Sequence, residues 1–294
     1  MVYLEWFRFP DADQEWDFFM KPELKRTCYD SYYPFQVLAG RLEWLEFEPV
    51  TILYGGNGSG KTTALNVMAA ALGLERDSPY NQSNFFPDYV EMCEYELTRG
   101  RLPEASRAIT SDDVFDYMLD LRALNQGIDE TREERFQEYL DAKYANFQMR
   151  TLDDYQRLKQ VNAARRKSQS QYVRSTLMGN ARERSNGENA FRYFTEKIQD
   201  SGLYLLDEPE NSLSPARQLE LAQFLSDSAR FYGCQLVIST HSPFLLALRG
   251  AKIYDLDQDP VEPCRWTQVP SVRTFYEFFR SRREEFEDEN GAPD

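Results

Sequence analysis

The sequence has few of the residues that build metal centres, disulfide frameworks or membrane spans. It holds one histidine and four cysteines in 294 residues. Because Cys28, Cys93, Cys234 and Cys264 are widely spaced and form no CxxC pair, neither a zinc site nor a disulfide framework is indicated. No segment approaches the run of about eighteen apolar residues that crosses a bilayer, and no signal peptide opens the chain. We therefore expect a cytoplasmic protein with reduced thiols and no membrane insertion.

Basic residues are outnumbered by acidic ones, with 34 Lys and Arg against 49 Asp and Glu, so the formal net charge is −15 at pH 7. This balance argues against nonspecific binding of nucleic acid or anionic lipid over the whole surface. The exception is the basic stretch 157–184, for which three interpretations stay open: contact with phosphates across a dimer, contact with a nucleic acid or acidic partner, and a solvated helix face balanced by the acids of 129–138. The stretch contains one acidic residue, Glu183. Its basic residues are Arg157, Lys159, Arg165, Arg166, Lys167, Arg174, Arg182 and Arg184.

Glycine is sparse too, yet four glycines gather in the phosphate loop, residues 55–62. This loop fits the GxxxxGKS/T (Walker A) pattern, with a predicted buried strand at 50–54 before it and a predicted helix at 62–72 after it. Glycines let the backbone N–H groups turn toward an anion, and the helix dipole points at the same site. The sequence therefore predicts an ATP site with these residues: Gly55, Gly56, Asn57, Gly58, Ser59, Gly60, Lys61, Thr62 and Thr63.

Two acids complete the Walker B pattern after an apolar strand at 203–206. The strand is apolar on both faces, as expected of a parallel strand covered by helices. The carboxyl end of such a strand lies beside the phosphate loop. Within the loop, Lys61 is expected to contact the β- and γ-phosphates. Thr62 and Asp207 are predicted to hold Mg²⁺, and Glu208 is predicted to polarise the water that attacks the γ-phosphate.

His241 follows the predicted core strand 235–240. A lone histidine is structural in many proteins. At the end of a core strand beside the acid pair, however, an imidazole can hydrogen-bond to a phosphate oxygen and to the attacking water. We therefore predict that His241 senses the γ-phosphate and is catalytic together with Glu208.

Two further stretches, Arg-Ser-Asn-Gly-Glu at 184–188 and Asn-Ser-Leu-Ser at 211–214, complete a series in a fixed order. This series resembles the ABC-class P-loop ATPases, and within them the stand-alone bacterial "AAA family ATPase" proteins with a Ser-x-Gly-Glu signature. The resemblance implies an α/β fold with a mostly parallel sheet core, an antiparallel N-terminal strand layer and an inserted helical lobe. We expect the core at 1–74 and 185–294 and the lobe at 75–184.

The resemblance also implies that the site is shared between two protomers. Ser185, Asn186, Gly187 and Glu188 would contact the γ-phosphate bound on the opposite protomer, and the loop at 211–214 would cross the dimer axis. Ser185 and Glu188 also fit a capping box, and both roles can hold together. Ser214 departs from the family pattern, because transporter ATPases carry Asp there.

One element of the family pattern is missing, namely the glutamine that reaches Mg²⁺ from a strand between the phosphate loop and the signature. Asp112, after the predicted strand 108–111, either replaces it as a magnesium ligand or caps a helix at 114–124. Tyr32, Tyr33 and Phe35 are candidates for stacking on adenine. Further helices are predicted at 131–147, 152–164 and 275–289, and the lobe is judged too short and too interrupted for a long coiled coil.

The alternation of strand and helix after residue 203 predicts a parallel, doubly covered sheet. Function follows from the resemblance: an ATP hydrolase that closes a head-to-tail homodimer on ATP and Mg²⁺. We expect it to switch a separate effector, in antiviral defence or DNA maintenance. Two alternatives stay open, an ATP-binding subunit of a membrane transporter and a slow ATP-gated scaffold.

Overall fold

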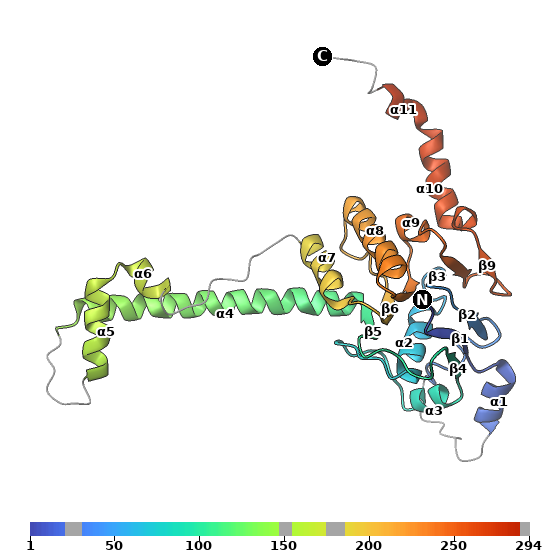
Figure 1. The fold of residues 1–294 in the computed structure, drawn as a ribbon, viewed down its shortest axis with the longest axis horizontal. Coiled ribbons are helices and arrows are strands. Elements are labelled where there is room, and N and C mark those ends of the chain that lie inside the picture. Colours follow the sequence, from blue (N-terminus) through green and yellow to red (C-terminus); the bar gives the residue numbers. More distant parts are fainter. Residues whose placement is uncertain (21–30, 147–154, 175–185, 289–294) are drawn as a thin grey trace. The chain divides into compact units, whose positions relative to one another are not determined.

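The computed structural model describes residues 1–20, 31–146, 155–174 and 186–288 (Figure 1). The chain divides into two compact units, Met1–Val114 with Asn186–Asp294, and Phe115–Ser185. The helical unit therefore begins at Phe115 rather than at residue 75. The reason is that two strands between these positions, β4 (Glu94–Leu97) and β5 (Arg107–Thr110), pair within the sheets of the first unit.

A six-stranded sheet with the order β5-β6-β7-β3-β8-β9 forms the centre of the first unit. Its other strands are β3 (Val50–Tyr54), β6 (Leu203–Asp207), β7 (Gln235–Ser239), β8 (Lys252–Asp255) and β9 (Pro263–Cys264). All neighbouring pairs are parallel except β8 and β9. Because parallel strands share one direction, the phosphate loop after β3, the acids at the end of β6 and His241 after β7 lie at one edge of the sheet.

A second sheet is antiparallel and has β1 (Leu4–Arg8) between β2 (Trp44–Glu46) and β4. The predicted mostly parallel core and antiparallel N-terminal strand layer are thus both confirmed. The sequence did not predict β4, because its residues, Glu-Tyr-Glu-Leu, are half acidic and largely exposed and give no apolar run.

The first unit also contains nine helical segments among the described residues. They are α1 (Ala12–Met20), α2 (Lys61–Ala71), α3 (Phe86–Glu91), α7 (Asn186–Lys197), α8 (Pro215–Phe231), α9 (Pro243–Leu246), the short 3-10 helix η3 (Trp266–Gln268), α10 (Pro270–Ser281) and α11 (Arg283–Asp288). α2 contacts β5, β6 and β7, and Figure 1 shows α8 on the other side of this sheet. The predicted C-terminal helix at 275–289 starts earlier, because Pro270 at the first helical position favours helix initiation, and it is interrupted at Arg282.

The second unit consists of helices. These are the greater part of α4 (Ser111–Tyr144), with α5 (Tyr155–Arg166) and α6 (Gln169–Arg174). A small apolar cluster of Tyr139, Ala164, Tyr172 and Val173 packs them together. α4 is continuous over 34 residues, so the expectation of separate helices at 114–124 and 131–147 was wrong. Gly127 lies inside this helix, where it costs about 1 kcal/mol relative to alanine without ending it.

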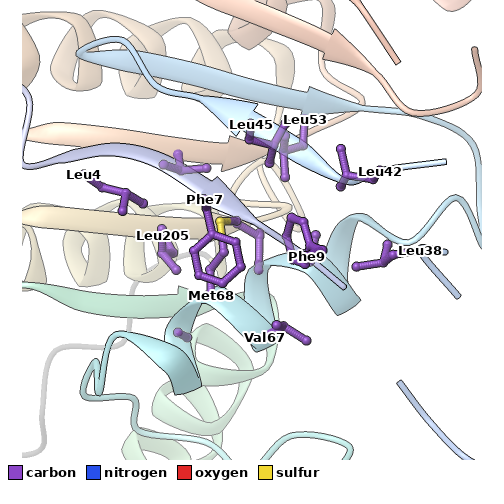
Figure 2. Packing of buried hydrophobic residues seen from close by; sticks show 14 of the residues in the cluster. Leu4, Phe7, Phe9, Leu38, Leu42, Leu45, Leu53, Val67, Met68 and Leu205 are labelled. Carbon is purple, nitrogen blue, oxygen red and sulfur yellow. The ribbon is translucent and has the colours of Figure 1, made fainter. Parts of the chain in front are cut away.

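The main core of the first unit joins both sheets to α2. Figure 2 shows Leu4, Phe7 and Leu45 of the antiparallel sheet close to Leu53 and Leu205 of the central sheet, with Val67 and Met68 of α2 beside them. All seven side chains are buried. This packing holds α2, and with it the end of the phosphate loop, against the central sheet.

Gln235 links the two sheets at the start of β7. Its Oε1 accepts hydrogen bonds from the backbone N–H groups of Tyr3 (2.7 Å) and Leu4 (2.8 Å), and its Nε2 donates to the Leu4 carbonyl (2.8 Å). The side chain is fully buried. The side-chain amide of Gln235 therefore provides the backbone of Tyr3 and Leu4 with the hydrogen bonds that a neighbouring strand would otherwise make, because an amide both accepts and donates hydrogen bonds.

Gln235→Ala is expected to lower the free energy of unfolding by about 3 kcal/mol, because it leaves the backbone groups of Tyr3 and Leu4 without these partners. Chemical denaturation monitored by circular dichroism measures this change. Gln223→Ala, at an exposed position of α8, is the matched control and should change stability by less than about 0.5 kcal/mol. Equal stability of the two variants would contradict the linking role of Gln235.

Candidate nucleotide-binding and hydrolysis site

The phosphate loop surrounds the ammonium group of Lys61. Its Nζ donates hydrogen bonds to the carbonyl oxygens of Gly55 (2.7 Å) and Gly56 (3.0 Å). Burial lowers the pKa of Lys61, and the carboxylates of Glu208 and Asp207 act in the opposite direction. The loop thus holds a buried cation whose present partners are neutral carbonyls, an arrangement in which an anion would be a stronger partner.

Gly60 is the loop position that requires glycine most clearly. Its φ of 96° lies in the left-handed region. An added Cβ would also lie 2.6 Å from Cδ2 of Leu38. α2 begins at the next residue, and its first N–H groups are the ones that have no partner within the helix. Gly60 therefore allows the abrupt change from loop to helix that directs these donors toward an anion.

Asp207 and Thr62 form the part of the site that fits a magnesium ion. Oδ1 of Asp207 is buried and has no hydrogen-bond partner within the described residues. Burial raises the pKa of Asp207, while the side chains of Thr62 and Ser239 interact with the carboxylate and lower it. A carboxylate and a hydroxyl, together with phosphate oxygens and water, are the oxygen ligands that Mg²⁺ prefers.

Glu208 and His241, the predicted catalytic residues, lie next to each other. Nε2 of His241 is 3.6 Å from Oε1 of Glu208. Asn211 donates from Nδ2 to the other carboxylate oxygen of Glu208 at 3.0 Å. Glu208 has a φ of 47°, in the region that side chains disfavour, so its conformation is maintained by its surroundings at a cost of about 1–2 kcal/mol.

Two acids of this region were missed by sequence reasoning. Glu210 accepts at Oε1 from the backbone N–H groups of His241 (2.6 Å) and Ser242 (3.1 Å). Asp257, after β8, accepts at Oδ2 from the backbone N–H of Gly56 (2.6 Å). Glu210 could have been noticed as a third acid directly after the Walker B pair, whereas Asp257 belongs to no motif and only the sheet brings it to the loop.

The described part of the signature lies in the first turn of α7. A Cβ on Gly187 would lie 3.5 Å from the carbonyl oxygen of Ser212. Glu188 accepts at Oε1 from Arg217 at 3.4 Å. Asn186–Glu188 therefore pack beside the loop 211–214 of their own chain. Ser185 lies outside the described residues, so its contact with phosphate and its capping of α7 stay predictions.

Ser214 caps α8 in place of the aspartate of the family pattern. Its φ and ψ are extended, and its Oγ accepts from the backbone N–H of Arg217 at 3.5 Å. Serine is a favourable residue at this position of a helix.

Asp112 is exposed on the first turn of α4, which begins at Ser111. The alternative in which Asp112 caps a helix starting at 114 was wrong, because α4 begins at Ser111 and Thr110 caps it. Oγ1 of Thr110 accepts from the N–H of Asp113 at 3.4 Å, and Oδ2 of Asp113 accepts from the N–H of Thr110 at 2.6 Å. A role for Asp112 in magnesium binding stays a prediction.

The aromatic candidates for adenine differ in exposure. Phe35 is 3% exposed and packs on Phe18 and Tyr89 in the core, so it offers no free face to a base. Tyr32 and Tyr33 are half-buried and contact Phe85 and Phe86, respectively.

The pKa of His241 is expected to lie below the usual value of about 6.5, because burial and the charge of Lys61 both lower it. Glu208 acts in the opposite direction, so Glu208→Gln should lower the pKa further. NMR titration of the imidazole measures both effects without assignment, since the chain has one histidine. A higher pKa in Glu208→Gln than in the wild type would contradict the observed proximity of these side chains.

Comparison with known proteins gives one family match. Residues 180–247 match the family model described as "AAA domain, putative AbiEii toxin, Type IV TA system". This segment contains Asp207, Glu208 and His241 but does not include the phosphate loop at residues 55–62. None of the curated proteins matches the chain.

Among the similar solved structures are one ABC transporter and two SMC head domains. A protein described as "a putative metal-chelate type ABC transporter" is 19% identical, with a TM-score of 0.37 over 78% of each chain. The Smc head domain of Pyrococcus furiosus is 12% identical, with a TM-score of 0.43 over 95% of this chain and 100% of that chain. The SMC head domain of Thermotoga maritima is 12% identical, with a TM-score of 0.35 over 86% and 94%. In the described part of this chain, no helix combines the length and apolar character that a membrane span requires.

Proposed function

We propose that this chain is an ABC-class P-loop ATPase that hydrolyses ATP with Mg²⁺ in order to switch a separate partner protein. The match of residues 180–247 to an AAA-domain family model and the order of the central sheet support this proposal. The observation that carries the proposal is the 3.6 Å approach of His241 to Glu208 at the sheet edge that bears the phosphate loop. Nucleotide binding alone needs no such pair, whereas activation of a water molecule does.

Each described residue has a specific role in this proposal. Lys61 would exchange the carbonyls of its loop for phosphate oxygens, and Thr62 and Asp207 would hold a magnesium ion, which when bound neutralises phosphate charge. Glu208 accepts a proton from the attacking water, with its carboxylate oriented by Asn211. His241 donates a hydrogen bond toward the γ-phosphate, which requires a proton on one ring nitrogen.

The second half of the site is supplied by another copy of the chain. The first turn of α7 packs against the loop 211–214 of its own chain, so these two stretches together form one surface. In a head-to-tail dimer this surface would close over the phosphate loop of the partner, with the N-terminus of α7 directed at the γ-phosphate. Two equal composite sites result, and ATP holds the dimer together.

Mixing two inactive variants tests this arrangement. Lys61→Met removes the phosphate ligand, and Gly187→Glu places a carboxylate on the opposing surface, where the glycine leaves room for a Cβ. Each variant alone should be inactive. An equal mixture should recover about a quarter of wild-type phosphate release, because half of the dimers are mixed and each contains one intact site. A mixture as inactive as its components would contradict the shared site.

The partner that is switched is proposed to be a separate effector protein in antiviral defence or DNA maintenance. The family description, which names a Type IV toxin–antitoxin system, favours this role over that of a transporter subunit. Affinity capture with ATP-bound Glu208→Gln as bait should enrich the product of a neighbouring gene. Enrichment of a protein with several transmembrane helices would favour the transporter alternative.

Nucleic acid is a second candidate partner, through the second unit. A groove of about 370 Å³ there is lined by the cationic side chains of Arg135, Lys159 and Lys167 and by Tyr155 and Tyr172. Tyr155 is 59% exposed, whereas Tyr172 is buried. Cations beside an exposed aromatic ring are typical of single-strand binding. Binding of a labelled single strand should weaken steeply with salt and should be reduced by Lys159→Ala.

A further inference from the structure

Glu210 connects the two loops that carry the catalytic pair. It stands on the loop after β6, two residues beyond Glu208, and its Oε1 accepts from two consecutive N–H groups of the loop after β7, those of His241 (2.6 Å) and Ser242 (3.1 Å). A carboxylate that accepts two backbone N–H groups makes short, charge-assisted hydrogen bonds. The peptide planes on both sides of His241 are therefore fixed relative to the Walker B loop.

The loop after β7 is held from its other side as well. Ser242 donates from Oγ to Oε1 of Gln218 on α8 at 2.8 Å, and the same Oγ accepts from the N–H of Phe244 as the cap of α9. Two contacts tie this loop to the Walker B loop. The backbone N–H of Glu208 donates to the carbonyl of Ser239 at 2.9 Å, at the end of β7, and Glu210 holds the loop further along, at His241 itself. Burial raises the pKa of the Glu210 carboxylate, while interactions with the Thr240 side chain and the His241 backbone lower it.

We propose that Glu210 is a positioning residue, which sets the 3.6 Å distance between the His241 imidazole and the Glu208 carboxylate through its two hydrogen bonds to the backbone. Its effect on hydrolysis rests on the proposed ATPase function. Its effect on the histidine does not, since the contacts exist without nucleotide.

Two conservative variants separate positioning from charge. Glu210→Gln keeps an acceptor oxygen at the same reach and removes the charge. Glu210→Asp keeps the charge and withdraws the oxygen by one methylene. A positioning role predicts that Gln is tolerated and Asp is not, whereas a role as proton acceptor or as bare charge predicts the reverse.

The histidine provides the readout, because His241 is the single histidine of the chain. The charges that act on its imidazole come from Lys61, Glu208 and Asp257. A displaced ring therefore titrates differently even when the charge of residue 210 is unchanged. In nucleotide-free protein, Glu210→Asp should shift the imidazole resonances and their titration midpoint, and Glu210→Gln should leave both near the wild type.

Turnover is the second readout. For Glu210→Asp we expect kcat to fall about tenfold to a hundredfold, as for a misplacement of about 1 Å, with KM for ATP within about twofold. Glu210→Gln should stay within about threefold of the wild type because its hydrogen bonds are weaker but present. Glu262→Gln and Glu262→Asp, at an exposed position between β8 and β9, are the matched controls.

Unchanged imidazole resonances in Glu210→Asp would overturn the proposal, and so would a loss of kcat in Glu210→Gln that Glu210→Asp does not share. If circular dichroism shows that Glu210→Asp does not fold, Glu210→Gln decides alone. Imidazole resonances that differ from the wild type in folded Glu210→Gln would then overturn the proposal. Absence of ATP hydrolysis in the wild type would refute the proposed function and leave the NMR test of Glu210 intact.

Discussion

Glu208→Gln should bind ATP with nearly wild-type affinity and hydrolyse it two to four powers of ten more slowly, a loss of about 3–5 kcal/mol of transition-state stabilisation. The amide keeps the size of the carboxylate and can still pair with Asn211, which lies 3.0 Å from Oε2. It cannot accept a proton from water. The fold should be unaffected, because glutamine and glutamate meet the same backbone restriction at a φ of 47°.

The slow step makes the variant accumulate in its ATP-bound form. We therefore expect Glu208→Gln to elute as a stable dimer with ATP and Mg²⁺ and as a monomer with ADP, measured by size-exclusion chromatography with light scattering. Phosphate release and binding of a fluorescent ATP analogue measure the other two effects. Glu262→Gln, at an exposed site, should match the wild type in all three. A Glu208→Gln protein that stays monomeric with ATP would refute the nucleotide-bridged dimer.

The parts of this site that could be predicted from the sequence are those with a local signal. The phosphate loop and the acid pair follow buried apolar strands, and such runs are recognisable because parallel strands covered on both sides need no polar face. His241 was found in the same way, from its place at the end of β7. Sheet order then brings these three ends together, as the register of β6 with β7 and of β7 with β3 shows.

The parts that could not be predicted depend on contacts between distant segments. Gln235 was assigned to a strand correctly, but its hydrogen bonds to Tyr3 and Leu4 join residues more than 200 positions apart. Asp257 reaches Gly56 across a similar separation. No window of sequence contains both partners of such a contact, so neither the link between the sheets nor the acid beside the loop has a sequence signature.

The boundary of the helical unit shows the same limit. Polar composition after residue 75 suggested a lobe, yet β4 and β5 belong to the sheets of the first unit. Their apolar residues are too few to outweigh their polar neighbours in a composition average. Pairing with β1 and β6 supplies the missing backbone partners, and pairing between distant strands is visible only in the fold.

Lys61→Met should abolish ATP-dependent behaviour while leaving the nucleotide-free fold intact. Methionine fills the space of the aliphatic stem but donates no hydrogen bond, so the affinity for Mg-ATP should fall at least about a hundredfold, or about 2.7 kcal/mol. Hydrolysis and the ATP-bound dimer should disappear together. In contrast to Glu208→Gln, the defect lies first in binding, so excess ATP should restore part of the nucleotide occupancy. Hydrolysis should stay low even at saturation, because Lys61 is also the expected cationic contact of the γ-phosphate.

The thermal stability of this variant distinguishes the loss of a ligand contact from damage to the fold. In free protein the net effect on Lys61 is a lowered pKa, with burial as the largest cause, so the charged form gains no net stability from its surroundings. Removing the charge should therefore leave the melting temperature without nucleotide unchanged or raise it. The wild type should gain about 2.7 kcal/mol of stability at an ATP concentration one hundred times its Kd, and Lys61→Met should gain almost none.

Lys252→Met is the matched control, because Lys252 is a half-buried lysine on the neighbouring strand β8 whose Nζ pairs with Glu46 at 3.1 Å, outside the phosphate loop. It loses a cation as Lys61→Met does, and it should keep the full stabilisation by ATP. If Lys61→Met kept that stabilisation too, the phosphate loop would not be the nucleotide site. If both variants lost it, a general reduction of positive charge would explain the loss, and the contacts of Lys61 with its loop would be structural.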